Sequence, residues 1–331
     1  MSRLTRRNFL QVSAGLAAFS GIAGTPKEAG ASPGKEALAT LIDCTRCDGC
    51  VDHDVPLCVA ACRERALNRI PDPVDPIPPL FPRGMIEDWS KRKDVYDRLT
   101  PYTQLFIQRA DVPVDGGIRT VYLPRRCMHC DNPPCATLCP FTANHKYPDG
   151  SVVIDPDLCF GGAKCRSVCP WNIPQRQSGI GIYLEIMPTL AGNGVMFKCD
   201  LCHDRLLNQQ LPLCVEACPR DAMVIGLRRD IMKEAERRAA ETGGYLYGLT
   251  ENGGTGTIYL SPVPFEEINK VVEKGPGRPH FDKVSRRPAR ASLMETSVLM
   301  SPVIGMGAGL TAAMLAVRNR VKKKGEGEND D

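Results

Sequence analysis

Residues 127–140 read CMHCDNPPCATLCP, and this stretch decides the fold. It contains two cysteines separated by two residues, a short gap, and two cysteines separated by three residues, the last followed by proline. The pattern returns at residues 47–62, 159–169 and 199–218, although Gly162 replaces the second cysteine of the third copy. Fifteen of the sixteen cysteines belong to these four copies. The cysteines therefore form a repeated ligand pattern.

The spacing is typical of thiolates that bind iron–sulfur clusters. In the bacterial ferredoxin run, three closely spaced thiolates bind one cluster, and the fourth cysteine, which precedes proline, reaches the neighbouring cluster. Zinc also binds paired cysteines, but zinc ribbons lack a third cysteine followed by x3-Cys-Pro. A disulfide scaffold would leave the four repeats unexplained. The pattern predicts an electron-transfer protein; a membrane-tethered structural protein whose cysteines hold zinc or form disulfides is the alternative.

The first copy has one cysteine in excess. The Ile-Asp pair at 154–155 stands just before Cys159, and the Ile-Asp pair at 42–43 stands at the same distance before Cys47. This register makes Cys44 the surplus thiol, which we expect to pack as a small buried apolar residue. The alternative ligand set, with a tighter spacing, consists of Cys44, Cys47, Cys50 and Cys62.

The third copy lacks one ligand, because the glycine at position 162 has no side chain to bind iron. One corner of that cluster has no protein thiolate, and this favours a three-iron cluster over a four-iron one. A four-iron cluster completed by water or by Asp157 is the alternative.

The composition is that of a globular protein without a nucleic-acid partner. The chain has 331 residues, is 43% hydrophobic, and carries a formal charge of +4, most of which falls in residues 1–31. The sequence contains no phosphate loop, no nucleotide fingerprint and no nucleophile with a readable base. We therefore assign the substrate chemistry to a partner subunit.

Both ends of the chain predict export and membrane attachment. Arg6 and Arg7 precede a weakly apolar stretch, which indicates a twin-arginine signal peptide over residues 1–31. Residues 296–317 carry no charge, which predicts a transmembrane helix, and the basic residues in 318–331 indicate a cytoplasmic tail. The alternatives are an amphipathic first helix and a buried last helix. The expected location is the cytoplasmic membrane, on its periplasmic side, through a single C-terminal span.

Other segments have weaker signals. Residues 71–82 form a proline-rich connector, and residues 87–98 are expected to form a short exposed helix. Residues 230–241 predict a charged helix and residues 257–260 a strand.

The chain resembles the four-cluster ferredoxin-like subunits of respiratory oxidoreductases, a group that includes the small subunits of dimethyl-sulfoxide reductase, nitrate reductase and formate dehydrogenase. The resemblance covers residues 38–230. Within the group it is most similar to the electron-transfer subunit of periplasmic membrane-bound nickel–iron hydrogenases. The motifs behind this closer match, besides the two chain ends, are Leu99-Thr100-Pro101-Tyr102-Thr103, Arg126-Cys127-Met128-His129-Cys130, Cys169-Pro170-Trp171-Asn172-Ile173-Pro174 and Lys198-Cys199-Asp200-Leu201-Cys202.

The resemblance implies that the first copy pairs with the fourth, and the second with the third. The implied ligand sets are Cys47, Cys50, Cys58 with Cys218; Cys199, Cys202, Cys214 with Cys62; Cys127, Cys130, Cys135 with Cys169; and Cys159, Cys165 with Cys139. The last set is the three-iron candidate, so the implied cofactors are three [4Fe-4S] clusters and one [3Fe-4S] cluster, or alternatively four [4Fe-4S]. Nitrate reductase subunits also depart from cysteine at the position of Gly162, whereas the hydrogenase pattern has cysteine there.

The resemblance also implies a fold and a role. The expected fold class is α+β, a tandem ferredoxin-like domain over residues 32–285 with two dicluster modules, 40–70 with 199–226 and 120–198, and a C-terminal transmembrane helix. The implied function is electron relay between catalytic subunits, namely hydrogenase large and small subunits, and an integral membrane quinone-reactive subunit. The same relay for a molybdenum oxidoreductase or a cytochrome complex, or a self-contained reductase, is the alternative.

Overall fold

The computed structural model describes residues 37–81, 85–189 and 193–285. Its largest sheet contains the strands β8 (Met223–Leu227), β1 (Leu38–Asp43), β10 (Thr257–Ser261) and β9 (Tyr245–Tyr247) in that order. β1 runs parallel to β10 and antiparallel to β8, while β9 and β10 are antiparallel. All six residues of β1 are buried, as expected for a central strand covered on both faces.

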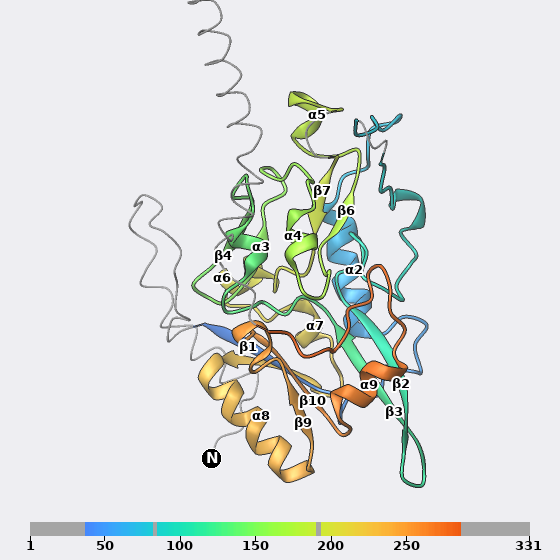
Figure 1. Ribbon diagram of the computed structural model, residues 1–331, viewed down its shortest axis with the longest axis vertical. Helices are drawn as coiled ribbons and strands as arrows, with labels where there is room; N and C mark the ends of the chain where they lie inside the picture. The colour runs from blue at the N-terminus through green and yellow to red at the C-terminus, as the bar shows by residue number, and fades with distance from the viewer. Residues whose placement is uncertain (1–36, 82–84, 190–192, 286–331) are drawn as a thin grey trace, which may run out of the picture. The chain divides into compact units, whose positions relative to one another are not determined.

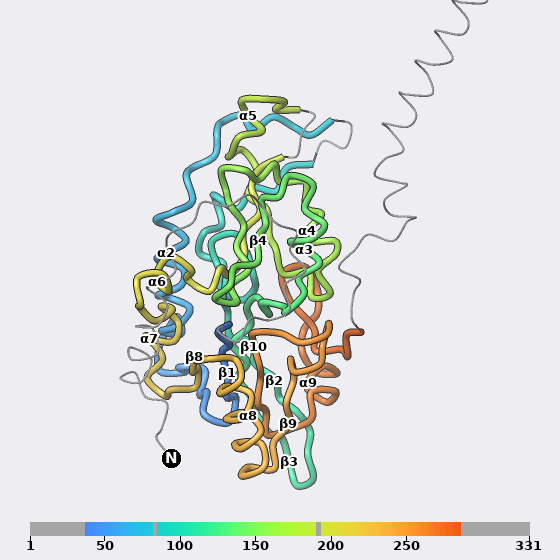
Figure 2. The backbone as a smooth tube through the Cα atoms, turned by 90° about the vertical axis from the view of Figure 1, so that its left-hand side faces the viewer, coloured from blue at the N-terminus to red at the C-terminus, as the bar shows by residue number. Residues whose placement is uncertain are grey.

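The two faces of this sheet contact different layers. Leu41 and Leu260 point toward helix α8 (Arg228–Thr242) and form a buried cluster with its residues Ile231 and Ala235. Their sequence neighbours point to the opposite face, because side chains alternate along a strand, and they join the core that surrounds the cysteine motifs. Figures 1 and 2 show α8 beside the sheet. The sheet is thus the wall between α8 and the cysteine-rich core.

Four helices carry the third cysteine of each motif copy. They are α2 (Leu57–Arg69), α3 (Pro134–Thr137), α4 (Lys164–Val168) and α7 (Leu213–Glu216). Three of them follow a proline at the N-cap, whose fixed backbone angle suits the entry to a helix. α2 packs against α7, and α3 packs against α4 (Figures 1 and 2). The first motif copy therefore lies beside the fourth, and the second beside the third.

Short elements complete the described part. The long hairpin of β2 (Phe106–Val114) and β3 (Gly117–Arg125) has buried inner ends and an exposed tip, where Ile118 is exposed. Two small hairpins pair β4 (Asn144–Lys146) with β5 (Val152–Ile154) and β6 (Gln175–Gln177) with β7 (Val195–Phe197). The other elements are η2 (Ser90–Arg92), α5 (Tyr183–Ile186), α6 (His203–Leu207), η3 (Glu251–Gly253) and α9 (Phe265–Val271).

The segment after the last motif covers the core. The predicted charged helix at 230–241 is confirmed as α8, and the predicted strand at 257–260 is confirmed as β10. The Trp171 indole N–H donates to the Tyr247 hydroxyl at 2.9 Å, and that hydroxyl donates to the Asp282 carbonyl at 2.8 Å. These bonds hold the segment against the third motif copy.

The helix predicted over residues 87–98 is wrong. Only the short 3-10 turn η2 forms there. The Glu87 amide donates to Ser178 Oγ at 2.9 Å, and the Trp89 amide donates to Gln177 Oε1 at 2.9 Å. Because these amides bond to another segment, tertiary contacts replace the local helical bonds.

The predicted transmembrane helix needs correction. Within the residues that the structure describes, no helix is long and apolar enough to cross a membrane. The longest, α8, has 15 residues and is rich in charge, whereas a span needs roughly 20 apolar residues. Residues 1–31, 296–317 and 318–331, which carry the predicted leader, span and tail, lie outside the described residues. The described residues thus supply no span for the predicted fold class or for the location based on it, whereas the ferredoxin-like part stands.

Candidate iron–sulfur sites

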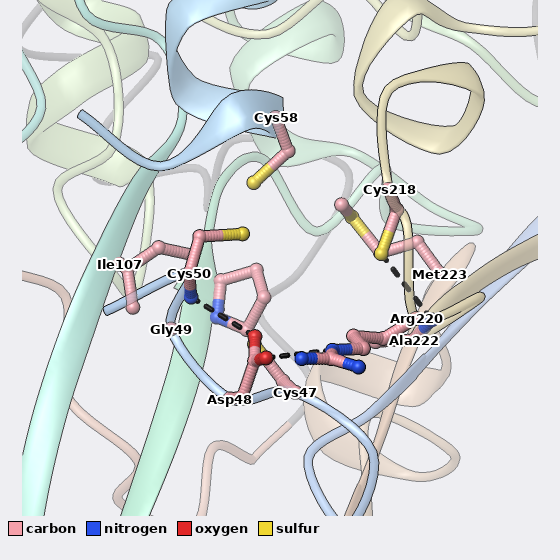
Figure 3. Close-up of a pocket in the computed structure, with 11 residues that line it drawn as sticks. Cys47, Asp48, Gly49, Cys50, Cys58, Ile107, Cys218, Arg220, Ala222 and Met223 are labelled. Atoms are coloured by element: carbon pink, nitrogen blue, oxygen red, sulfur yellow. Dashed lines mark hydrogen bonds and ion pairs between the residues drawn. The ribbon is translucent and has the colours of Figure 1, made fainter. Parts of the chain in front are cut away.

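Site I is a cavity lined by cysteines from the first and fourth motif copies. Its cysteines are Cys47, Cys50, Cys58 and Cys218. The first two lie in the loop after β1, the third lies near the start of α2, and the fourth follows α7. Figure 3 shows the sulfur atoms of Cys50, Cys58 and Cys218 around a common space. The structure thus brings together the first ligand set that the resemblance implies.

The loop of site I is held in a tight curl. Gly49 has φ +72°, and a Cβ at this position would lie 2.4 Å from the Tyr122 ring, so only glycine fits. Asp48 accepts a hydrogen bond from the Cys50 amide at 3.0 Å and pairs with Arg220 at 2.6 Å (Figure 3). Burial raises the pKa of Cys47 to about 12, although a backbone hydrogen bond from Gly49 opposes the rise. The curl therefore places amide donors close to the thiols.

Site II is a second cavity, with cysteines from the same two motif copies. Its cysteines are Cys62, Cys199, Cys202 and Cys214. Cys62 lies on α2 one turn after the α2 cysteine of site I, so one helix serves both sites. Burial, followed by repulsion from Cys214, raises the pKa of Cys202 to about 12. Arg126 also lines this cavity.

The second and third motif copies gather their thiols in two further groups. The ligand sets that the resemblance implies put Cys127, Cys130, Cys135 and Cys169 at site III, and Cys139, Cys159 and Cys165 at site IV. Burial and then the neighbouring Cys135, Cys169 and Cys127 raise the pKa of Cys130, which places these thiols close together. Burial and then Cys135, Cys159 and Cys139 raise the pKa of Cys165. Cys135 thus stands near both groups, as a cysteine of α3 facing α4 would.

Site IV has an open position where the other sites have a cysteine. A Cβ at Gly162 would meet no atom within 4 Å. Asp157, the alternative ligand, is an exposed residue of the turn before Cys159. The space at position 162 is therefore compatible with a missing thiolate.

Cys44 stands apart from these groups. Its side chain is buried, its Sγ lies 4.0 Å from the Ile42 carbonyl oxygen, and it does not line site I. Burial raises its pKa well above the ordinary value. The alternative set with Cys44 also needs Cys62, which the structure places at site II.

Backbone amides direct their N–H groups at several of these sulfurs. Ala222 donates to Cys218 Sγ at 3.3 Å, and Met196 donates to Cys159 Sγ at 3.4 Å. Hydrogen bonds to cluster sulfurs are one of the means by which proteins set reduction potentials. Backbone amides at these sites can therefore stabilise negatively charged sulfur by hydrogen bonding.

The thiols fit an iron–sulfur cluster better than a single ion. Within the described ranges, no three His, Cys, Asp or Glu side chains converge closely enough to hold one metal ion. All sixteen cysteines lie in those ranges, and none forms a disulfide. Buried thiols with raised pKa values also need positive charge to ionise, and several irons would supply it. Such a cluster provides one-electron redox chemistry when bound.

Sequence reasoning missed two buried cations. Arg126 directly precedes Cys127, and Lys198 directly precedes Cys199, so their place before the first cysteine of a motif was the available signal. Burial alone would lower the pKa of Lys198, but Cys127 and Cys135 outweigh it and raise the pKa. Both cations lie among the cysteines.

A carboxylate anchors the segment at residues 87–98 beside site IV. Glu87 accepts hydrogen bonds from Arg166, on α4, and from Arg176, whose Nη1 also donates to the Gly161 carbonyl at 2.8 Å. Burial would raise the pKa of Glu87, but the hydrogen bonds from both arginines outweigh it and lower the pKa. The segment at residues 87–98 is thus tied to the loop that contains position 162.

Glu87→Gln should lower the urea midpoint of unfolding. The change leaves two arginines without their anion, and we expect a loss of about 1–2 kcal/mol because the group is partly buried. Glu185→Gln, at an exposed carboxylate on α5, is the control and should change stability by less than about 0.5 kcal/mol. Equal midpoints for the two variants would show that the anchor contributes nothing.

Comparison with known proteins finds a family model and several relatives that match this chain. The family model described as a 4Fe-4S dicluster domain matches residues 118–228. A protein of Nitratidesulfovibrio vulgaris is 36% identical over 281 residues, which cover 82% of this chain and 68% of that protein. The hydrogenase-2 operon protein HybA of Escherichia coli O157:H7 is 29% identical over 99% of both chains.

A third relative comes from a different complex. This relative, one of the chains of the anaerobic dimethyl sulfoxide reductase of Escherichia coli K12, is 31% identical over 59% of the present sequence and 75% of its own length. The matched dicluster domain covers the second, third and fourth motif copies. The chain therefore belongs to the 4Fe-4S dicluster family of ferredoxin-like electron-transfer subunits.

Proposed function

We propose that the chain holds three four-iron clusters, at sites I, II and III, and one three-iron cluster at site IV. The observation that carries this proposal is that two cavities are each lined by four cysteines drawn from both members of a pair of motif copies. Each site combines three cysteines, or two at site IV, from one copy with the last cysteine of its partner copy. This exchange is the arrangement of two-cluster ferredoxins.

The clusters form a linear series in this proposal. Cys58 and Cys62 stand one helical turn apart on α2, which joins site I to site II. Cys135 and Cys139 have the same spacing, which joins site III to site IV. Burial, followed by repulsion from Cys214 and Cys127, raises the pKa of Cys199 although Arg126 opposes the rise, and this supports a position of site II beside site III. The order is therefore I, II, III, IV.

The protein relays electrons along these clusters between a catalytic oxidoreductase subunit and a second redox partner. The match to HybA over 99% of both chains supports a nickel–iron hydrogenase as the catalytic partner. A quinone-reactive membrane subunit is the proposed partner at the other end. The match to the relative from anaerobic dimethyl sulfoxide reductase supports a molybdenum oxidoreductase as the second candidate.

Metal analysis of the anaerobically purified full chain tests the cofactors. We expect about fifteen irons and about sixteen acid-labile sulfides per chain. About sixteen irons would indicate four [4Fe-4S] clusters. Zinc without labile sulfide would overturn the relay and support the structural alternative.

Purification of the native complex tests the partner. A co-purifying subunit that contains nickel supports the hydrogenase, and a subunit that contains a molybdenum pterin supports the second candidate. If the isolated protein turned over an artificial donor and acceptor by itself at a physiological rate, a self-contained reductase would replace the relay.

A further inference from the structure

Two buried cations occupy the junction between the two dicluster modules. Arg126 is 1% exposed and Lys198 is 6% exposed. In the sequence, Arg126 directly precedes Cys127 of site III and Lys198 directly precedes Cys199 of site II. Each cation, however, lies close to thiols of the other site.

Arg126 faces site II. Its Nη1 donates to Cys214 Sγ at 3.7 Å, and the side chain lines the cavity together with the four site II cysteines. Its Nε and Nη2 have no hydrogen-bond partner among the residues that the structure describes, and the carboxylate that lines the same cavity, Asp200, pairs with Arg65 instead. A buried guanidinium without an anion is costly, so the cavity beside it must receive negative charge.

Lys198 faces site III. Its Nζ donates to the carbonyl oxygens of Val152 and Cys199, so its only hydrogen-bond partners in the described part are neutral carbonyls. Val152 belongs to the buried cluster that contains Cys135 of site III, and the charges of Cys127 and Cys135, followed by that of Cys199 of site II, outweigh burial and raise the pKa of Lys198. The Val152 amide in turn donates to Nδ1 of the buried His129 at 3.0 Å, which fixes this part of the junction.

We infer that Arg126 raises the reduction potential of the cluster at site II and that Lys198 raises the potential of the cluster at site III. Reduction adds one negative charge to a cluster, and a fixed positive charge in a dry interior stabilises that charge. An electron that passes between sites II and III leaves one cluster as it enters the other. Because each cation raises the potential of one of these two clusters, both cations favour an electron on the clusters at the junction. The inference rests on the proposed function, because it requires clusters at both sites.

Glutamine variants test each cation separately. In an EPR-monitored redox titration of the full chain, Arg126→Gln should lower one midpoint potential and Lys198→Gln should lower a different one. We expect at least a tenfold loss in the equilibrium constant for reduction, which is a downward shift of about 59 mV for one electron. Arg125→Gln is the matched control, because this neighbouring buried arginine lies over the Phe281 ring, donates to the Pro279 carbonyl and does not line the cavity of site II.

The outcomes separate this inference from the proposed function. Low iron and sulfide in the parent protein would refute the clusters themselves. Full iron content with unshifted midpoints in both glutamine variants, or equal shifts in Arg125→Gln, would overturn the role of the cations. If a glutamine variant assembles with less than the full iron content, the charge-retaining variants Arg126→Lys and Lys198→Arg decide. The inference is supported if the charge-retaining variant restores the iron content and the parent potential. It is overturned if that variant also lacks iron or the parent potential.

Discussion

Cys47→Ala should remove or damage one cluster, whereas Cys44→Ala should leave about fifteen irons per chain. The two thiols stand three residues apart, yet only Cys47 lines site I. Loss of this ligand leaves three cysteines at the site, so iron should fall to between about eleven and about fourteen per chain. Metal analysis and cluster absorbance of the two purified variants measure the difference.

The stability of the two variants should differ in the same direction as their iron content. Binding of a cluster is coupled to folding, so the loop between β1 and α2 loses its anchor when site I is damaged. Cys44→Ala removes only one buried sulfur, and we expect a cost of about 1 kcal/mol. Cys47→Ala should lower the thermal midpoint much further. If Cys44→Ala lost iron and Cys47→Ala kept it, the register of the first motif copy would be wrong.

The cysteine sites could be predicted from sequence because the spacing of cysteines that lie close together along the chain is enough to recognise each motif. The pairing of Cys58 with Cys62 on one helix follows from a four-residue spacing, and the motif repeats around Pro56 and Pro212 make two copies visible as relatives. The sheet could not be predicted in this way. Thr40 pairs with Thr257, and no local pattern connects these positions.

The remaining differences arise from tertiary contacts. The segment at 87–98 has the composition of a short helix, but its amides bond to Ser178 and Gln177, which lie in another module. Arg126 and Lys198 look like ordinary surface cations in the sequence, and only the fold shows that each is buried close to thiols of the other site. Cationic residues are rarely buried without a paired anion, so composition offered no reason to place them in the core.

Gly162→Cys should convert the proposed three-iron cluster into a four-iron one. The position can accept the side chain, because a Cβ there meets no atom within 4 Å. The neighbouring Gly161 could not, since it has φ +69° and its Cβ would lie 2.4 Å from the Gly194 carbonyl oxygen. A thiolate at position 162 restores the spacing of the other copies, so it should supply the fourth corner of the cluster at site IV.

EPR of the air-oxidised protein measures this conversion. The parent should show a three-iron signal that disappears in Gly162→Cys, while iron rises from about fifteen to about sixteen per chain. Gly162→Ala is the matched control, because it adds the Cβ without the sulfur and should keep the signal. A parent protein without a three-iron signal would show that water or Asp157 completes the cluster. A signal that persists in Gly162→Cys, with the parent's iron content, would place the missing ligand elsewhere, because a new thiolate at the vacant motif position would then have failed to bind.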